Sequence, residues 1–324
     1  CCSSGTDALL LSLMACGVER GDAVFTTPFT FIATAEVIAL LGAVPVFVDI
    51  DERTFNMDPA KLGEAVEALA GGTKPASGIP DGVRAAAVMP VDLFGLPADY
   101  DAINDIASRH GLRVIEDGAQ GFGGTYKGKM ACNLAEIAAT SFFPAKPLGC
   151  YGDGGAVLTS SDDLADAVNS LRVHGKGTDK YDNVRIGING RLDTLQAAVL
   201  LAKMDVFADE IEKRQVVAGR YTEALSGVVT VPHFPDGYRS AWAQYSVRSD
   251  RRSEITAKLK ETGIPTAIYY PKPLHLQTAF SYLGYKPGSM PVPEAVSNDI
   301  FSLPMHPYLE AAEQEQVART IGAI

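Results

Sequence analysis

Leu112-Arg113-Val114-Ile115-Glu116-Asp117-Gly118 is a short apolar run that ends in two acidic residues and a glycine. It is too short for a helix and has polar or glycine residues at its ends, as a buried strand of a mainly parallel sheet would. Five similar runs precede or follow it along the chain. The predicted strands are Ala23–Thr26, Val44–Asp49, Arg84–Pro90, Leu112–Glu116, Thr140–Phe143 and Ala156–Thr159.

Longer amphipathic segments with readable helix ends separate these runs. Asp58-Pro59 places a capping carboxylate before a first-turn proline, and Gly71 follows the last apolar position of that segment. Asp99–His110 ends at Gly111, and Asp162–Val173 opens with paired acids. Strands alternating with helices predict an α/β domain, a mostly parallel sheet covered by helices on both faces.

The pattern changes after Asn189. One proline-free helical stretch runs from Asp193 to about Ser226. Beyond it we expect, in order, a strand at Trp242–Arg248, a helix near Ser253–Thr262, a strand at Thr266–Tyr270 and a C-terminal helix. We therefore predict a large domain over residues 1–205 and a smaller C-terminal α/β domain over residues 206–324.

Composition narrows the class of protein but names no function. The chain has 324 residues, of which 28 are Lys or Arg and 39 are Asp or Glu, for a net charge of −11, and it has no dense basic stripe. We therefore expect no nucleic-acid or membrane partner. Val37–Val48 is broken by glycine and proline and is too short to cross a bilayer. Five cysteines without metal-ligand spacing predict reduced thiols in a cytoplasmic protein with no metal site.

Two segments could bind the ends of a phosphorylated ring compound. Ser3-Ser4-Gly5-Thr6-Asp7 runs directly into the apolar helix Ala8–Cys16, so free backbone N–H groups and the Thr6 hydroxyl could hold a phosphate. The alternative is a plain Ser/Thr helix cap. Asp117 follows a buried strand, where its charge could keep a ring nitrogen protonated. The alternative is that Asp117 caps a helix.

Two further segments carry cations. Lys146 lies between Pro144 and Pro147 beside two phenylalanines, which restricts the backbone and disfavours the ammonium form, as suits a Schiff-base lysine. A surface loop is the alternative. The second segment, Gly187-Ile188-Asn189-Gly190-Arg191, is either a linker or a loop that binds an anion across an interface.

A phosphate site, an acid for a ring nitrogen and a constrained lysine are together the groups that a pyridoxal-phosphate enzyme requires. The sequence resembles the DegT/StrS family of sugar aminotransferases, which are fold-type I enzymes with a three-layer α/β/α large domain. The resemblance covers nearly the whole chain. It rests on SSGTDAL, TPFTFIATAE, PVDLFGLPADYDAI, VIEDGAQGFGGTYKGK, SFFPAKPLGCYGDGGAV, GINGRLDTLQAAVL, YYPKPLHLQ and SLPMHPYL.

The resemblance implies a role for each matching residue. Lys146 would be the Schiff-base lysine and proton carrier, with Asp117 at the pyridine nitrogen and Gln120 beside the ring. Phe31 would stack on the cofactor. The phosphate would be held by Gly5, Thr6 and Ser141, and Asn189 would reach the phosphate in the partner subunit of a homodimer with shared active sites. The candidates for contact with the nucleotide-sugar are Arg191, Tyr269, Tyr270 and Lys272.

Within the family the sequence is most similar to the branch that makes the 3-amino group of a UDP-2-acetamido-glucuronate, with glutamate as donor, for surface polysaccharide (O-antigen) assembly. Tyr269 replaces a usual histidine and Ala145 a frequent hydroxyl residue, so a 4-amino sugar or another nucleotide stays an alternative. A non-catalytic cofactor-binding regulator and a Rossmann-like binding module are more distant ones. Compared with the family, we expect the chain to lack an N-terminal portion and to carry an insertion at Gly71–Gly82.

Overall fold

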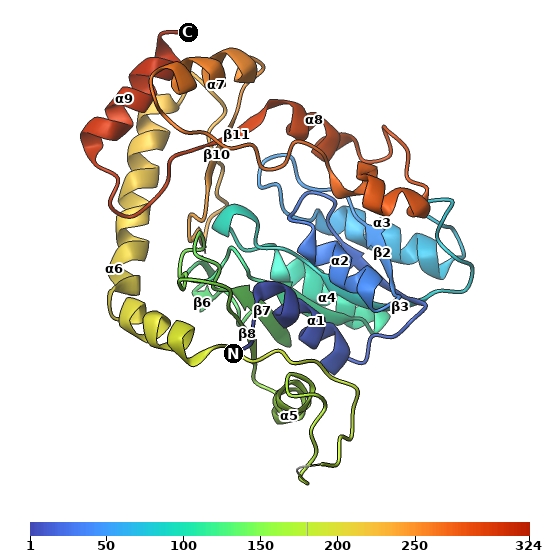
Figure 1. Ribbon diagram of the computed structural model, residues 1–324. Coiled ribbons are helices and arrows are strands. Elements are labelled where there is room, and N and C mark those ends of the chain that lie inside the picture. Colours follow the sequence, from blue (N-terminus) through green and yellow to red (C-terminus); the bar gives the residue numbers. More distant parts are fainter. Residues whose placement is uncertain (180) are drawn as a thin grey trace.

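The computed structural model describes residues 1–179 and 181–324 of the chain. A six-stranded sheet in the order β2-β1-β3-β4-β7-β8 forms its centre (Figure 1). All neighbours pair in parallel except β7 and β8, which are antiparallel. The strands are β1 (Asp22–Thr26), β2 (Val44–Phe47), β3 (Arg84–Met89), β4 (Arg113–Asp117), β7 (Ile137–Ser141) and β8 (Gly155–Thr159). All six expected strands of this sheet are therefore present, although β7 lies earlier in the chain than the predicted Thr140–Phe143 and contains neither Phe142 nor Phe143.

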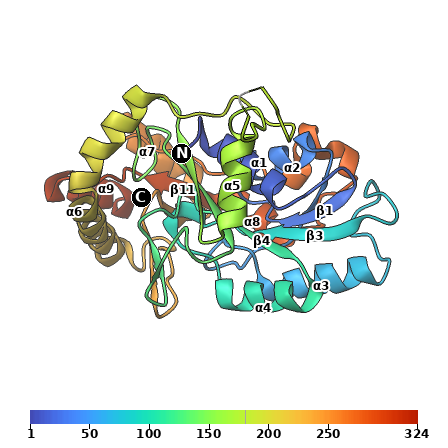
Figure 2. The ribbon, with the colours of Figure 1, turned by 90° about the horizontal axis from the view of Figure 1, so that it is seen from below.

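Helices cover both faces of this sheet (Figure 2). One face packs against α1 (Gly5–Ala15), α2 (Ala33–Leu40) and α5 (Asp162–Leu171), and the other against α3 (Pro59–Ala70) and α4 (Tyr100–His110). Each face has its own apolar core, and successive residues of β1 alternate between them. Val24 packs in the core on the side of α1 and α5, and Phe25 packs in the core on the side of α3 and α4. Both are fully buried. The α/β class with a three-layer arrangement is confirmed.

The helix ends lie where the sequence predicts them. Asp58 accepts hydrogen bonds from the N–H groups of the first turn of α3, and Gly71 follows its last residue. Gly111 ends α4 in the left-handed conformation, with φ of 67°, which an L side chain rarely adopts. Local side-chain chemistry thus sets the lengths of these helices.

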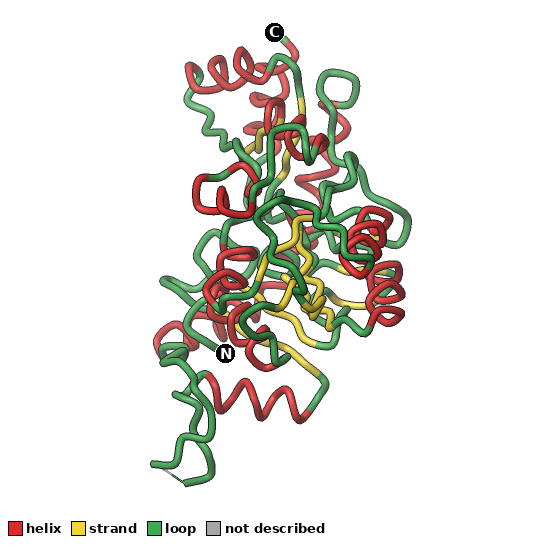
Figure 3. The backbone as a smooth tube through the Cα atoms, turned by 90° about the vertical axis from the view of Figure 1, so that its right-hand side faces the viewer, coloured by secondary structure: helices red, strands yellow, loops and turns green. Residues whose placement is uncertain are grey.

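The C-terminal part of the chain has a core of its own. A two-stranded antiparallel sheet of β10 (Tyr245–Arg248) and β11 (Ile300–Leu303) packs with α6 (Thr194–Leu225), α7 (Arg252–Glu261) and α9 (Ala311–Gly322). Figure 3 shows it at the opposite end of the molecule from the described residues between α5 and α6. The remaining elements are short: β5 (Thr125–Tyr126), β6 (Lys129–Met130), β9 (Tyr238–Arg239), η1 (Leu93–Gly95), η2 (Leu274–Leu276), η3 (Thr278–Leu283) and α8 (Pro291–Asp299).

One expected strand is wrong. Residues 266–270 form no regular strand, since only Ala267 makes a bridge, to Ser302. After this single bridge to β11 the chain turns toward the large sheet. There Leu274, Phe280 and Tyr285 enter the apolar core that contains α3 and α4. The division at residue 205 stays a prediction.

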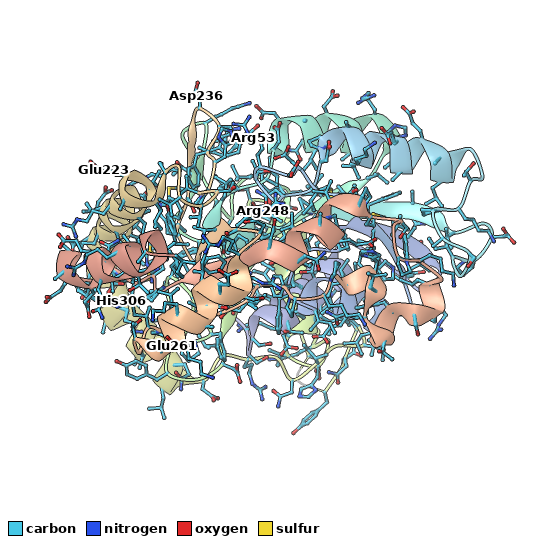
Figure 4. The ribbon with its side chains drawn as sticks, turned by 90° about the horizontal axis from the view of Figure 1, so that it is seen from above. Arg53, Glu223, Asp236, Arg248, Glu261 and His306 are labelled. Carbon is cyan, nitrogen blue, oxygen red and sulfur yellow. The ribbon has the colours of Figure 1, made fainter. Side chains whose placement is uncertain are left out.

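Charged side chains join the two parts. Arg248 of β10, near the middle of the view in Figure 4, donates to both carboxylate oxygens of Asp299, at 2.9 and 3.0 Å. It also donates to Glu52 of the large domain at 3.1 Å. The 32-residue helix α6 is a second connection. Its Lys203 donates to the carbonyl of Gly149 at 2.6 Å, and its Arg214 donates to the carbonyl of Trp242 at 2.8 Å.

Candidate active site

The N-terminus of α1 lies against the end of β7. A Cβ atom added to Gly5 would lie 2.6 Å from the Cβ atom of Ser141, so only glycine permits this approach. The Ser4 hydroxyl caps the helix by accepting from the N–H of Asp7 at 3.0 Å. Within the described residues, the N–H groups of Gly5 and Thr6 have no acceptor. The segment is therefore a capped helix that still offers free donors to an anion.

Asp117 ends β4 and is 3% exposed. Its Oδ2 accepts from the Thr34 hydroxyl at 2.8 Å, and its Oδ1 accepts from the N–H of Ala119 at 3.2 Å. Burial raises the pKa of Asp117, whereas these two hydrogen bonds and the cation of Lys146 lower it. The carboxylate is thus held in one orientation, as it must be to pair with a protonated ring nitrogen.

Lys146 stands on a tight loop between β7 and β8. The N–H of Lys146 donates to the carbonyl of Phe143 at 2.9 Å, and the N–H of Cys150 donates to the carbonyl of Phe142 at 2.7 Å. Burial lowers the pKa of Lys146, and the charge of Asp117 opposes this only in part. The loop therefore presents an amine that loses its proton more readily than an ordinary lysine.

Gln120 lies in the turn after Asp117 and is 4% exposed. Its Oε1 accepts from the N–H of Phe94 at 2.7 Å, and its Nε2 donates to the Tyr270 hydroxyl at 3.2 Å. Burial raises the pKa of Tyr270, and the charge of Asp117 contributes to the rise. Gln120 and Tyr270 thus belong to the same site as Asp117.

Other predicted site residues face solvent. The side chain of Phe31 is 55% exposed and that of Tyr269 is 36% exposed. Asn189, Arg191 and Lys272 are exposed too, and their side chains make no hydrogen bond or ion pair with the part of the chain that the structure describes. The exposed residues are therefore not held in the site by this chain. The residues that the structure does bring together are Gly5, Thr6, Ser141, Asp117, Gln120, Tyr270 and Lys146.

Sequence reasoning missed Thr34, the direct partner of Asp117. Thr30 and Thr34 are four residues apart, and their hydroxyls lie 3.2 Å from each other at the start of α2. The spacing was an available signal, since residues four apart lie on one face wherever the chain is helical.

Asp92 and Glu116 were missed as well. Both are fully buried behind Asp117. The two oxygens of Glu116 accept from the N–H groups of Cys132 and Leu134. Asp92 Oδ1 accepts from Tyr100 and Ala98, whereas its Oδ2 lacks a partner in the described residues. Burial and the charge of Glu116 raise the pKa of Asp92 well above its usual value. We therefore expect Asp92 to be the protonated member of this pair of buried carboxyl groups.

The residues fit pyridoxal phosphate. Free N–H donors at the end of α1 suit its phosphate, the fixed carboxylate of Asp117 suits its ring nitrogen, and the amine of Lys146 suits its aldehyde. In contrast, the described residues contain no group of three His, Cys, Asp or Glu that could hold a metal ion.

No helix in the described part of the chain is both long and apolar enough for a bilayer crossing. A groove of about 670 Å³ lies elsewhere, lined by residues such as Glu52, Arg53, His233 and Arg248. It includes none of the residues predicted for the site.

Comparison with known proteins agrees with this chemistry. The model of the DegT/DnrJ/EryC1/StrS aminotransferase family matches residues 1–322. A curated relative from Pseudomonas aeruginosa, UDP-2-acetamido-2-deoxy-3-oxo-D-glucuronate aminotransferase, is 48% identical over 96% of this chain and 82% of its own.

Solved structures agree as well. A DegT DnrJ EryC1 StrS aminotransferase from Brucella abortus is 51% identical, with a TM-score of 0.94 over 99% of this chain and 84% of its own. The NtdA structure from Bacillus subtilis, solved with bound cofactor PMP, is 31% identical, with a TM-score of 0.86 over 99% of this chain and 72% of its own.

The fold and the site together define a fold-type I, pyridoxal-phosphate-dependent aminotransferase. The chain belongs to the DegT/DnrJ/EryC1/StrS aminotransferase family.

Proposed function

We propose that the enzyme moves an amino group from glutamate to the keto group of a nucleotide-linked sugar, UDP-2-acetamido-3-keto-glucuronate, and releases the 3-amino sugar for surface polysaccharide (O-antigen) synthesis. The observation that carries the reaction class is the pairing of a buried, doubly hydrogen-bonded Asp117 with the constrained amine of Lys146. The choice of sugar rests on the 48% identity to the relative from Pseudomonas aeruginosa.

Each half of the reaction needs a proton moved between carbon and nitrogen. Bound pyridoxal phosphate supplies an electron sink for the carbon that loses the proton. Lys146 is the base that takes this proton and the acid that returns it. Asp117 keeps the ring nitrogen protonated, and Gly5, Thr6 and Ser141 hold the phosphate. Thr34 keeps Asp117 oriented throughout.

The predicted residues at the surface complete the site for substrate and cofactor. We assign Arg191, Tyr269, Tyr270 and Lys272 to the nucleotide-sugar, whose phosphates and carboxylate suit cationic and hydroxyl donors. Phe31 covers one face of the cofactor. We assign Asn189 to the cofactor phosphate of a second subunit; its side chain is exposed and has no partner among the residues described in its own chain, so it is free to make that contact.

A homodimer with shared active sites accounts for the apolar surface near this loop. Ile186 is 90% exposed, Leu195 is 80% exposed and Leu201 is 69% exposed. Such a concentration of exposed apolar side chains is typical of an interface. All five cysteines are free thiols, which supports a place in the reducing cytoplasm.

The test is a panel of keto-sugar nucleotides with glutamate as donor and 2-oxoglutarate release as the readout. We expect the 3-keto-glucuronate linked to UDP to give the highest kcat/KM. A preference for a 4-keto sugar or for a dTDP-sugar would move the assignment to the alternative that Tyr269 and Ala145 leave open. A colourless protein that ignores added cofactor would contradict the site assignment itself.

A further inference from the structure

We infer that Gln120 is a positioning residue, which turns the hydroxyl of Tyr270 into a hydrogen-bond donor aimed at an oxygen of the bound cofactor or sugar. This inference rests on the proposed place of the cofactor between Asp117 and Lys146. It adds to the roles given above, in which Gln120 lies beside the ring and Tyr270 contacts the substrate.

The amide of Gln120 has only one orientation that satisfies its neighbours. The N–H of Phe94 can only donate, so the Gln120 atom 2.7 Å from it must be the carbonyl oxygen. Phe94 stands in the left-handed region with φ of 58°, and its N–H is buried, so losing this acceptor would be costly. Nε2 must therefore face Tyr270.

The direction of the second hydrogen bond follows. Nε2 of Gln120 can only donate, so the Tyr270 oxygen, 3.2 Å away, accepts. The hydroxyl proton of Tyr270 then points away from Gln120. In the described residues nothing else accepts it. A partly buried hydroxyl with an unused proton, next to the residues of the site, is available to an acceptor that binds there.

The surroundings fix where Tyr270 stands. Its ring packs edge-on against Phe29, with ring centroids 5.9 Å apart, and Phe29 belongs to an apolar cluster with Phe55 and Phe94. The charge of Asp117 acts on its hydroxyl, and burial keeps the hydroxyl protonated by raising its pKa. The ring is thus held by Phe29, and Gln120 fixes the side from which the hydroxyl accepts, so its proton points away from Gln120.

The decisive variant is Gln120→Glu. Glutamate keeps the shape and still accepts from the N–H of Phe94, but its second oxygen can only accept. It therefore takes the Tyr270 proton and reverses the hydrogen bond. We expect kcat/KM to fall about tenfold, the loss expected for one neutral hydrogen bond. Tyr270→Phe keeps the ring contacts and removes the hydroxyl, so it should show a similar loss.

The double variant separates positioning from other effects. In the Tyr270→Phe background, Gln120→Glu should cause little further loss, because the proton that it redirects is gone. Additive losses would overturn the inference, as would a Gln120→Glu enzyme with parental kcat and KM. If Gln120→Glu fails to fold, Tyr270→Phe alone still decides, since parental kinetics and cofactor binding there would show that the hydroxyl has no acceptor.

Cofactor titration of each purified protein, followed by absorbance, identifies the acceptor. A weaker cofactor affinity and a shifted absorbance maximum in the two single variants place it on the cofactor. Unchanged cofactor binding with a raised KM for the keto-sugar places it on the sugar. A parental protein that binds no cofactor would contradict the proposed site, whereas a parental protein that binds it and variants that match the parent would contradict only this inference.

Discussion

Two parts of the active site differ in how they are held. The cofactor floor, which we define as Thr34, Asp117 and Gln120, is buried, and its side chains are hydrogen-bonded within the chain. The rim loop, residues 187–191, carries Asn189 and Arg191, whose exposed side chains have no partner in the described residues. The floor under the cofactor ring is thus completed within one chain, whereas the rim loop, which we assign to the sugar and to the partner's cofactor phosphate, is left open to ligand and partner.

The largest effect should come from Lys146, the reacting group above the floor. Lys146→Ala removes the base and the amine together, so we expect transamination to fall by about a thousandfold or more. The check is 2-oxoglutarate release over hours. A Lys146→Ala protein that transaminated at the parental rate would show that Lys146 is not the reacting lysine.

Replacing the floor carboxylate should have the next largest effect. Asp117→Asn keeps the shape but no longer favours a charged ring nitrogen, so we expect kcat to fall about a hundredfold. Thr34→Val is the matched control, because it removes one hydrogen bond and leaves the charge. Its loss should be about fivefold. Equal losses in the two variants would mean that orientation, and not charge, is what Asp117 supplies.

The buried carboxyl groups of Asp92 and Glu116, which lie behind Asp117, should affect the free energy of unfolding. Glu116→Gln should destabilise the protein by about 2 kcal/mol, since an amide cannot accept from both Cys132 and Leu134. Asp92→Asn should change the free energy of unfolding by less than about 1 kcal/mol, because an amide N–H can replace the proton of a neutral acid. Urea unfolding measures both. The reverse order would assign the proton to Glu116.

The rim loop should show a smaller effect that depends on the partner. Arg191→Ala should raise the KM of the keto-sugar about tenfold, as expected for a charge-assisted hydrogen bond. At a keto-sugar concentration well below the parental KM, Arg191→Ala subunits mixed in equal amount with Lys146→Ala subunits should recover about a quarter of parental activity if the sites are shared, because half of the dimers are then hybrids with one intact site each. No gain over the separate proteins would place Arg191 in its own subunit's site.

The smallest effect concerns pH. In the cofactor-free protein the folded state lowers the pKa of Lys146 below that of the unfolded chain. The unfolded state therefore binds more protons between the lowered value and about 10.4, so this residue's contribution to stability rises with pH in that window. Lys146→Met should be more stable than the parent at pH 7, by a margin that shrinks toward pH 10 in urea unfolding. A constant margin would show that Lys146 titrates normally.

The sequence was most informative where structure is local. Helix α3 begins after Asp58 and ends before Gly71 as predicted, because capping residues act within a single turn. The strand predicted at residues 266–270 is wrong. The sequence of an apolar run gives its periodicity and its length, but it does not tell whether another strand lies beside it to pair with. Gln120 could be placed in the site, but its hydrogen bond to Tyr270 joins residues 150 positions apart. Such a pairing exists only once the chain has folded.

Helix α6 joins two anchor points, the Lys203 contact with Gly149 and the Arg214 contact with Trp242. Eleven residues of helix separate them, about 16 Å at 1.5 Å per residue. A helix resists compression, so α6 acts as a spacer of set length. It separates the loop that carries Lys146 from the segment that leads into β10. We therefore expect a displacement of that segment along α6 to reach the loop that carries Lys146 through these two contacts. On this view we expect a substitution on the C-terminal half of α6, far from the cofactor, to change the reacting amine without touching it.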